Sequence, residues 1–132
     1  MALTFTHTLK SVLSGQTIGN GASVTSSEQD LGDDAIAQQI WLHWSVSGYN
    51  TTPAGNKRMT IKLAAVAATG ATAETDCCPS YVFTTDADQA YYGCVPVASL
   101  PRFFVVKAMN DTTQTTDVGG FHATIEMVVE TV

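Results

Sequence analysis

The sequence predicts an all-β protein: an antiparallel β-sandwich of about 7–8 strands, with a jelly roll among the topologies that fit. The composition is the first reason, because 45% of the 132 residues are apolar, only 14% are charged, and Thr and Ser are abundant. Threonine is β-branched and suits a pleated, half-exposed surface. The second reason is period-two alternation of apolar residues in several segments, and the third is the regular recurrence of turn residues between them.

The clearest alternation lies in residues 36–47, IAQQIWLHWSVS. A strand there turns one set of side chains to a core: Ile36, Gln38, Ile40, Leu42, Trp44 and Val46. A helix capped by Asp33 or Asp34 is the alternative, since Ile36, Ile40 and Trp44 are spaced at four. Leu42 and Val46 fit only the strand, which we therefore expect.

The remaining strands are predicted in the same way. Alternation recurs in 58–67 (RMTIKLAAVA) and in 121–132 (FHATIEMVVETV), and shorter candidates occupy 3–12, 80–85 and 90–98. Residues 102–109, RFFVVKAM, are apolar on both parities apart from Arg102 and Lys107. That pattern predicts a central strand, buried on both sides or covered by a neighbouring subunit.

Residues 14–31, SGQTIGNGASVTSSEQDL, are polar and rich in glycine, yet Ile18, Ala22 and Val24 recur at even spacing. We expect an extended, backbone-rich arm that is free to contact neighbours. Residues 1–31 would then form this arm plus the first strand, within a single β-sandwich domain that spans 1–132.

The charge balance excludes some partners. A net charge of -6 argues against nucleic-acid binding, which needs clustered basic residues. The start, MALTFTHTLK, has no signal-peptide pattern, and no stretch approaches the roughly 20 apolar residues of a membrane-spanning helix. We expect a protein that is made in a cytoplasm and has no membrane partner.

Cysteines and carboxylates give no strong metal or cofactor signal, and we expect neither group. A bridge from Cys94 to Cys77 or to Cys78 is conceivable, but reduced cysteines are favoured and the spacing does not suit zinc. Asp86 and Asp88 in TTDADQ resemble a fragment of a calcium loop without its glycine and distal glutamate. A solvated turn is the favoured interpretation, with a weak cation site as the alternative.

Catalytic signals are also missing, so we expect no enzyme. The sequence contains no nucleophile motif and no phosphate loop. His7, His43 and His122 are interpreted as half-exposed strand residues. A small enzyme that uses His43 and His122 is the last-ranked alternative.

Trp41 stands out because it shares a face with His43, opposite the core-facing Trp44. Exposed tryptophan is enriched at interfaces, although a neighbouring strand or loop could equally cover it. A carbohydrate-binding sandwich with Trp41, Tyr91 and Tyr92 as stacking groups is therefore a further alternative.

Several segments together resemble small structural proteins of tailed bacteriophages. They are SGQTIGNGASVTSSEQDLG, IWLHWSVSG, RFFVVKAMNDTTQTTD and GFHATIEMVVE, with turn motifs at 19–21, 26–27, 30–32 and 110–112. The Cys77-Cys78 pair and the segment AYYGCVPVA have no counterpart in that pattern.

The resemblance implies a capsid decoration (cement) protein on the head surface of the virion. Its partners would be further copies of itself, with a trimer favoured, and the major capsid protein. A tail or tail-fibre component is the runner-up. The expected interface residues are Ile18, Asn20, Val24, Trp41, His43, Phe103 and Val105.

Overall fold

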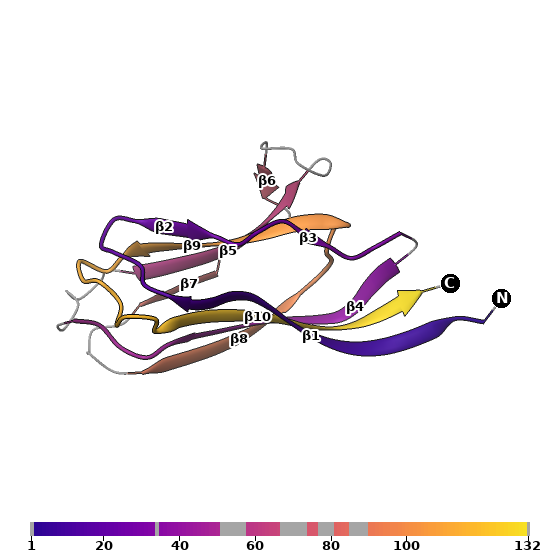
Figure 1. The fold of residues 1–132 in the computed structure, drawn as a ribbon, viewed down its shortest axis with the longest axis horizontal. Coiled ribbons are helices and arrows are strands. Elements are labelled where there is room, and N and C mark those ends of the chain that lie inside the picture. Colours follow the sequence, from indigo (N-terminus) through magenta and orange to yellow (C-terminus); the bar gives the residue numbers. More distant parts are fainter. Residues whose placement is uncertain are drawn as a thin grey trace.

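The fold consists of two antiparallel β-sheets packed face to face (Figure 1). A computed structural model describes residues 2–33, 35–50, 58–66, 74–76, 81–84 and 90–131, and this part of the chain contains no helix and hence none that could span a membrane. The all-β prediction is confirmed. The strands are β1 (Thr4–Gln16), β2 (Ser23–Thr25), β3 (Gln29–Asp30), β4 (Ala35–Val46), β5 (Arg58–Val66), β6 (Glu74–Asp76), β7 (Tyr81–Thr84), β8 (Tyr91–Val97), β9 (Phe103–Asp111) and β10 (Phe121–Thr131).

The strand order is that of a jelly roll. Sheet A has the order β1-β10-β4-β8, and sheet B has the order β2-β9-β5-β6, with β3 also on β9 and β7 also on β5. Counting β2 with β3 and β6 with β7 as interrupted strands leaves eight positions. The first then pairs with the last, the second with the seventh, the third with the sixth and the fourth with the fifth. A long antiparallel ribbon folded over on itself in this way is a jelly roll.

The core lies between the two sheets and follows the predicted alternation. Sheet A contributes inward side chains such as Leu42 and Ile125, and sheet B contributes Ile61 and Leu63, each with no exposed surface. In the middle of sheet B, β9 turns Phe104 inward. The central position predicted for this strand is confirmed, because β9 pairs with β5 on one side and with β2 and β3 on the other.

The alternation in β4 fails at its start. Ile36 is 60% exposed, whereas Ile40 on the same parity is buried. The pairing of β4 with β10 shifts between Glu126 and Val128, and Gln39 there has a positive φ of 51°. A β-bulge of this kind adds one residue to a strand and reverses the side-chain parity beyond it. The bulge therefore turns Ile36 to the outside.

The expected free arm is instead part of the sandwich. Residues 23–25 and 29–30 hydrogen-bond to β9 as the edge of sheet B, and Ser26 bridges the gap by accepting a 2.9 Å bond on Oγ from the Val106 amide. Ile18 is fully buried in the core. The arm prediction is corrected for this physical reason: the backbone groups of the segment are already paired with β9.

Two crossings between the sheets run side by side and are held by Asn110. Its Nδ2 donates to the carbonyls of Ile18 (2.9 Å) and Gln114 (2.8 Å), and its Oδ1 accepts from the Thr112 amide (3.0 Å) and hydroxyl (2.6 Å). The Thr116 hydroxyl accepts a further 2.9 Å bond from the Ile18 amide. Asn110 is 1% exposed, so all four of its bonds form away from water.

Replacing Asn110 by Ala should destabilise the fold by about 3 kcal/mol, because two carbonyls, an amide and a hydroxyl lose their buried partner. Asn110→Asp should cost a comparable amount, because a carboxylate oxygen would face two carbonyls. The exposed Asn20, replaced by Ala, is the matched control, with an expected change below about 0.5 kcal/mol. Urea unfolding measures all three. Equal stabilities of the Asn110 and Asn20 variants would contradict the role assigned to Asn110.

Candidate binding face

The outer face of sheet A carries the chemically distinctive side chains of the described residues. Neighbouring strands bring these residues together because β1 pairs with β10, β10 with β4, and β4 with β8. On each strand, the parity opposite the core points outward. The outer face of sheet A is defined here by Phe5, His7, Leu9, Trp41, His43, Tyr92, Cys94, Thr124 and Glu126.

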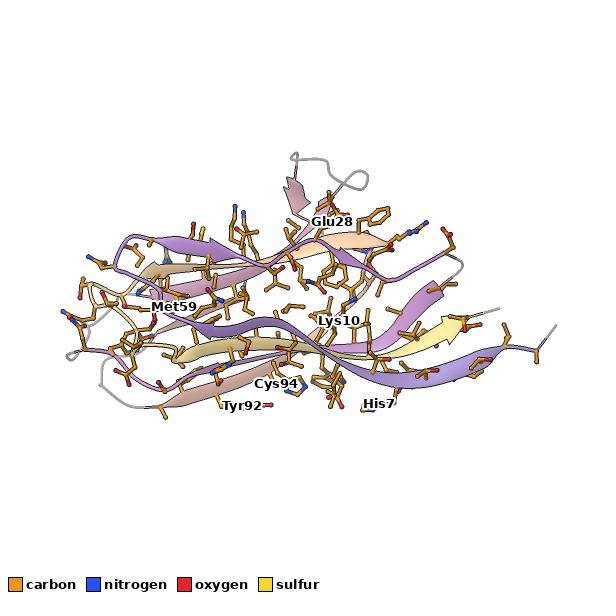
Figure 2. The ribbon with its side chains drawn as sticks, in the orientation of Figure 1. His7, Lys10, Glu28, Met59, Tyr92 and Cys94 are labelled. Atoms are coloured by element: carbon orange, nitrogen blue, oxygen red, sulfur yellow. The ribbon has the colours of Figure 1, made fainter. Side chains whose placement is uncertain are left out.

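A hydrogen-bonded chain crosses all four strands of this face. His7 Nε2 lies 2.9 Å from Glu126 Oε2, and His43 Nε2 lies 2.9 Å from Glu126 Oε1. The other ring nitrogen of His43 contacts the Tyr92 hydroxyl, and the two rings are tilted with centroids 5.9 Å apart. Figure 2 shows His7, Cys94 and Tyr92 along the same outer side of the sandwich, the lower side in this view. Glu126 is thus the centre of the chain and holds a histidine on each oxygen.

The two histidines also set the electrostatics of Glu126. Hydrogen bonds from His7 and then from His43 lower the pKa of the Glu126 carboxyl below its usual value, and partial burial opposes this only weakly. The carboxylate is therefore the stable form near neutral pH, and the charge it brings to the face is already paired.

Glu126 separates two shallow hollows. One, of about 140 Å³, is lined by His7, Gln39, Trp41 and Val128 in addition to Glu126. The other, of about 350 Å³, lies on the Tyr92 side and is also lined by Leu9, His43 and Thr124. Each hollow therefore has one exposed aromatic wall and shares the same polar centre.

The outer face of sheet A gives little support for a metal site or a catalytic nucleophile. Among the described residues, no group of three or more His, Cys, Asp or Glu side chains could hold a metal ion. Cys94 has a free thiol 3.8 Å from His43 Nε2. Partial burial, and secondly the charge of Glu126, raise the pKa of this thiol, so the unreactive protonated form is favoured. The arrangement is suited to holding a ligand or partner, and less to activating a nucleophile.

The expected interface residues do not form one surface. Trp41 and His43 lie on the outer face of sheet A, and Trp41 is 42% exposed. Asn20 is exposed and Val24 is half-buried, both beside β9 at the edge of sheet B. Three residues are less accessible: Ile18 is fully buried, Val105 is 6% exposed, and Phe103 is half-buried under the Arg102 guanidinium.

Other predicted positions are scattered or fall elsewhere. His122 is on the outer face, but its Nδ1 accepts a 3.1 Å bond from the Gly15 amide, away from His43. Tyr91 and Tyr92 are both exposed on β8. Cys77, Cys78, Asp86 and Asp88 lie outside the described residues. Sequence reasoning missed the partnership of Glu126 with His7 and His43, because these residues lie 119 and 83 positions from Glu126 in the chain.

Comparison with known proteins gives a fold and no family. No family model and no curated protein matches the sequence. The coat protein of Tobacco streak virus matches with a TM-score of 0.50 and 4% identity over 97% of this chain and 86% of that one. Turnip yellow mosaic virus matches with a TM-score of 0.49 and 7% identity over 98% and 80%, respectively. CBM35 from Cellvibrio japonicus Abf62 matches with a TM-score of 0.48 and 9% identity over 94% and 92%. At 4% identity, the similarity to the Tobacco streak virus coat protein concerns the fold alone.

The depressed pKa of Glu126 can be tested by titration. In the folded protein, NMR of the side-chain carboxyl should give a pKa below the ordinary value of about 4.3. His7→Ala and His43→Ala should each raise it by removing a donor. Because the folded pKa is the lower one, this stabilisation is complete above about pH 4.3 and is lost as the pH falls through the folded pKa. Glu126→Gln should therefore unfold with a shallower acid dependence than the parent, and identical acid profiles would contradict the assignment.

Proposed function

We propose that this protein is a non-enzymatic structural component of a virion, and that it decorates the capsid head and stabilises the shell. The outer face of sheet A carries the proposal. It presents large apolar side chains on rigid strands, with Phe5 60% and Leu9 64% exposed. Its carboxylates, Glu126 and Glu130, accept hydrogen bonds from two histidines and from Gln38, respectively, so neither is left without a hydrogen-bond partner when the face is covered.

The fold supports the same proposal, since the Tobacco streak virus coat protein has a similar fold along 97% of this chain. The phage resemblance of the sequence favours the head over the tail, which remains the runner-up location. A cement protein acts by repeating modest contacts around a symmetry axis, so that avidity makes the assembly tight. Its partners would be further copies of this chain, a trimer being favoured, and the major capsid protein.

Particles from the native source, labelled with gold-conjugated antibody to this chain, test the location. We expect label distributed over the head. Label confined to the tail would replace the proposal by its runner-up, and unlabelled particles would overturn the virion assignment.

Recombinant protein added to undecorated heads tests whether the outer face of sheet A makes the contact. Trp41→Lys should weaken binding at least about tenfold, the effect of roughly 1.4 kcal/mol. Val118→Lys, a change at a residue 94% exposed in a loop, should leave binding unaltered.

A second candidate function is carbohydrate binding at the same face. Trp41 and Tyr92 are 42% and 64% exposed. Because Tyr92 pairs with Ser45, four residues from Trp41 on β4, the backbone positions of the two residues are offset by about 13 Å along the strands. His43 and Glu126 lie between them. Aromatic surfaces on either side of hydrogen-bonding groups are suited to a short saccharide, which would stack on the rings and bond to the polar centre.

Glycan-array screening followed by calorimetry tests this candidate. Trp41→Ala and Tyr92→Ala should each weaken binding of a retained glycan by roughly tenfold. Tyr92→Phe should weaken it less, because the ring remains and only the hydroxyl is removed. An array with no retained glycan, or equal affinities of the parent and Trp41→Ala, would eliminate the candidate.

A further inference from the structure

We propose that β1 is a self-association edge, which pairs antiparallel with β1 of a second copy about a two-fold axis centred on His7. The proposal deepens the self-association in the proposed function, but it rests on the geometry of one strand. It therefore holds or fails independently of where the protein resides.

The outer edge of β1 is open. Among the described residues, β1 pairs along one side only, with β10, and the register from Thr4 to Ser11 is unbroken. Bulges occur only beyond Ser11, this stretch has no proline, and residues 2–7 are all exposed. In Figure 1 the first half of β1 lies at the free border of sheet A. Long, regular edge strands of this kind are templates for pairing with another strand, and natural proteins normally protect them.

The sequence of β1 is complementary to itself in one register. A two-fold axis perpendicular to the sheet keeps outward residues opposite outward residues. One residue of β1 must therefore lie directly opposite its own copy, with the axis between the two. Centring on His7 places Phe5 opposite Leu9 of the second copy, and Leu9 opposite Phe5. Directly opposed apolar side chains stabilise antiparallel pairs. Centring on Thr8 would instead oppose Phe5 to Ser11, and centring on Thr6 would oppose Phe5 to His7 and Leu9 to Leu3, which precedes the strand.

The charges permit this register. Lys10, the only Lys or Arg residue in β1, lies opposite Thr4 of the second copy, and its Nζ donates to the Asp30 carbonyl within its own chain (3.4 Å). Glu126 and Glu130 lie on β10, one strand behind the junction, where they are the register partners of Leu9 and Phe5 on β1. No two Lys, Arg, Asp or Glu side chains are therefore directly opposed, despite the net charge of -6, and the His7 side chains that face each other at the axis each contact Glu126 of their own chain.

Pairing would join two copies of sheet A into one continuous sheet and place the exposed Phe5 and Leu9 side chains against each other. Such a two-fold contact is isologous, so it produces dimers or doubles a cyclic oligomer, and it would join two of the trimers favoured above into a hexamer. The expected assemblies therefore contain an even number of chains.

A charge exchange tests both the contact and its register. Phe5→Glu and Leu9→Lys should each raise the dissociation constant of the purified protein at least tenfold, measured by analytical ultracentrifugation. An equimolar mixture of the two variants should associate again, because only the His7-centred register brings the new carboxylate opposite the new ammonium. The double variant Phe5→Glu/Leu9→Lys should likewise recover. Val118→Lys is the control and should associate like the parent, and circular dichroism verifies that each variant is folded.

Several results would overturn the proposal. These are a monomeric parent at all concentrations, an oligomer that neither single variant weakens, or folded single variants that dissociate without recovery in the mixture. If the parent is monomeric but the antibody still labels capsid heads, the β1 contact is overturned and the head location stands. If the protein forms the β1-paired dimer but particles carry no label, the head location is overturned and the β1 contact stands.

Discussion

The buried side chain of Asn110 is the interaction on which the wrapping of this sandwich depends. A jelly roll must carry its chain from one sheet to the other at several points, and each crossing exposes backbone groups that no ladder satisfies. Asn110 satisfies groups of both crossings that meet there, those of Ile18 and of residues 112–114. The backbone bonds between Asn110 and residues 21–22 then start the pairing of sheet B. The same residue therefore links the two crossings to the start of the β2 edge.

The contrast between the two sheets explains where function is expected. In sheet B, β9 is buried on both sides around Phe104 and Val105, whereas Met109 further along its outer side is 38% exposed. The outer face of sheet A carries the exposed Trp41 together with His43 and Glu126, which hydrogen-bond to each other between neighbouring strands. Paired polar groups within an apolar surface cost little to desolvate, because no charge loses its only partner. That property suits a face that meets another macromolecule or a ligand.

Much of this could be predicted from the sequence, and the misses have specific causes. Alternation correctly placed Leu42, Trp44 and Ile125 in the core, because a period of two maps directly onto the faces of a strand. It failed at Ile36, where a bulge reverses the parity, and a bulge leaves no mark in a hydrophobicity pattern. It also failed for 14–31, whose glycines and hydroxyl residues suggested an arm although the backbone is bonded to β9.

The sequence by itself determined the fold class and the side of each strand on which His43, Trp41 and Glu126 lie, because local alternation encodes burial. Only the tertiary structure decided which strands are neighbours, and hence that His7 and His43 share the two oxygens of Glu126. Register is set by long-range pairing and by bulges, whose energies belong to two distant segments at once. The open edge of β1 is decided in the same way, since a strand is an edge only by virtue of what fails to pair with it.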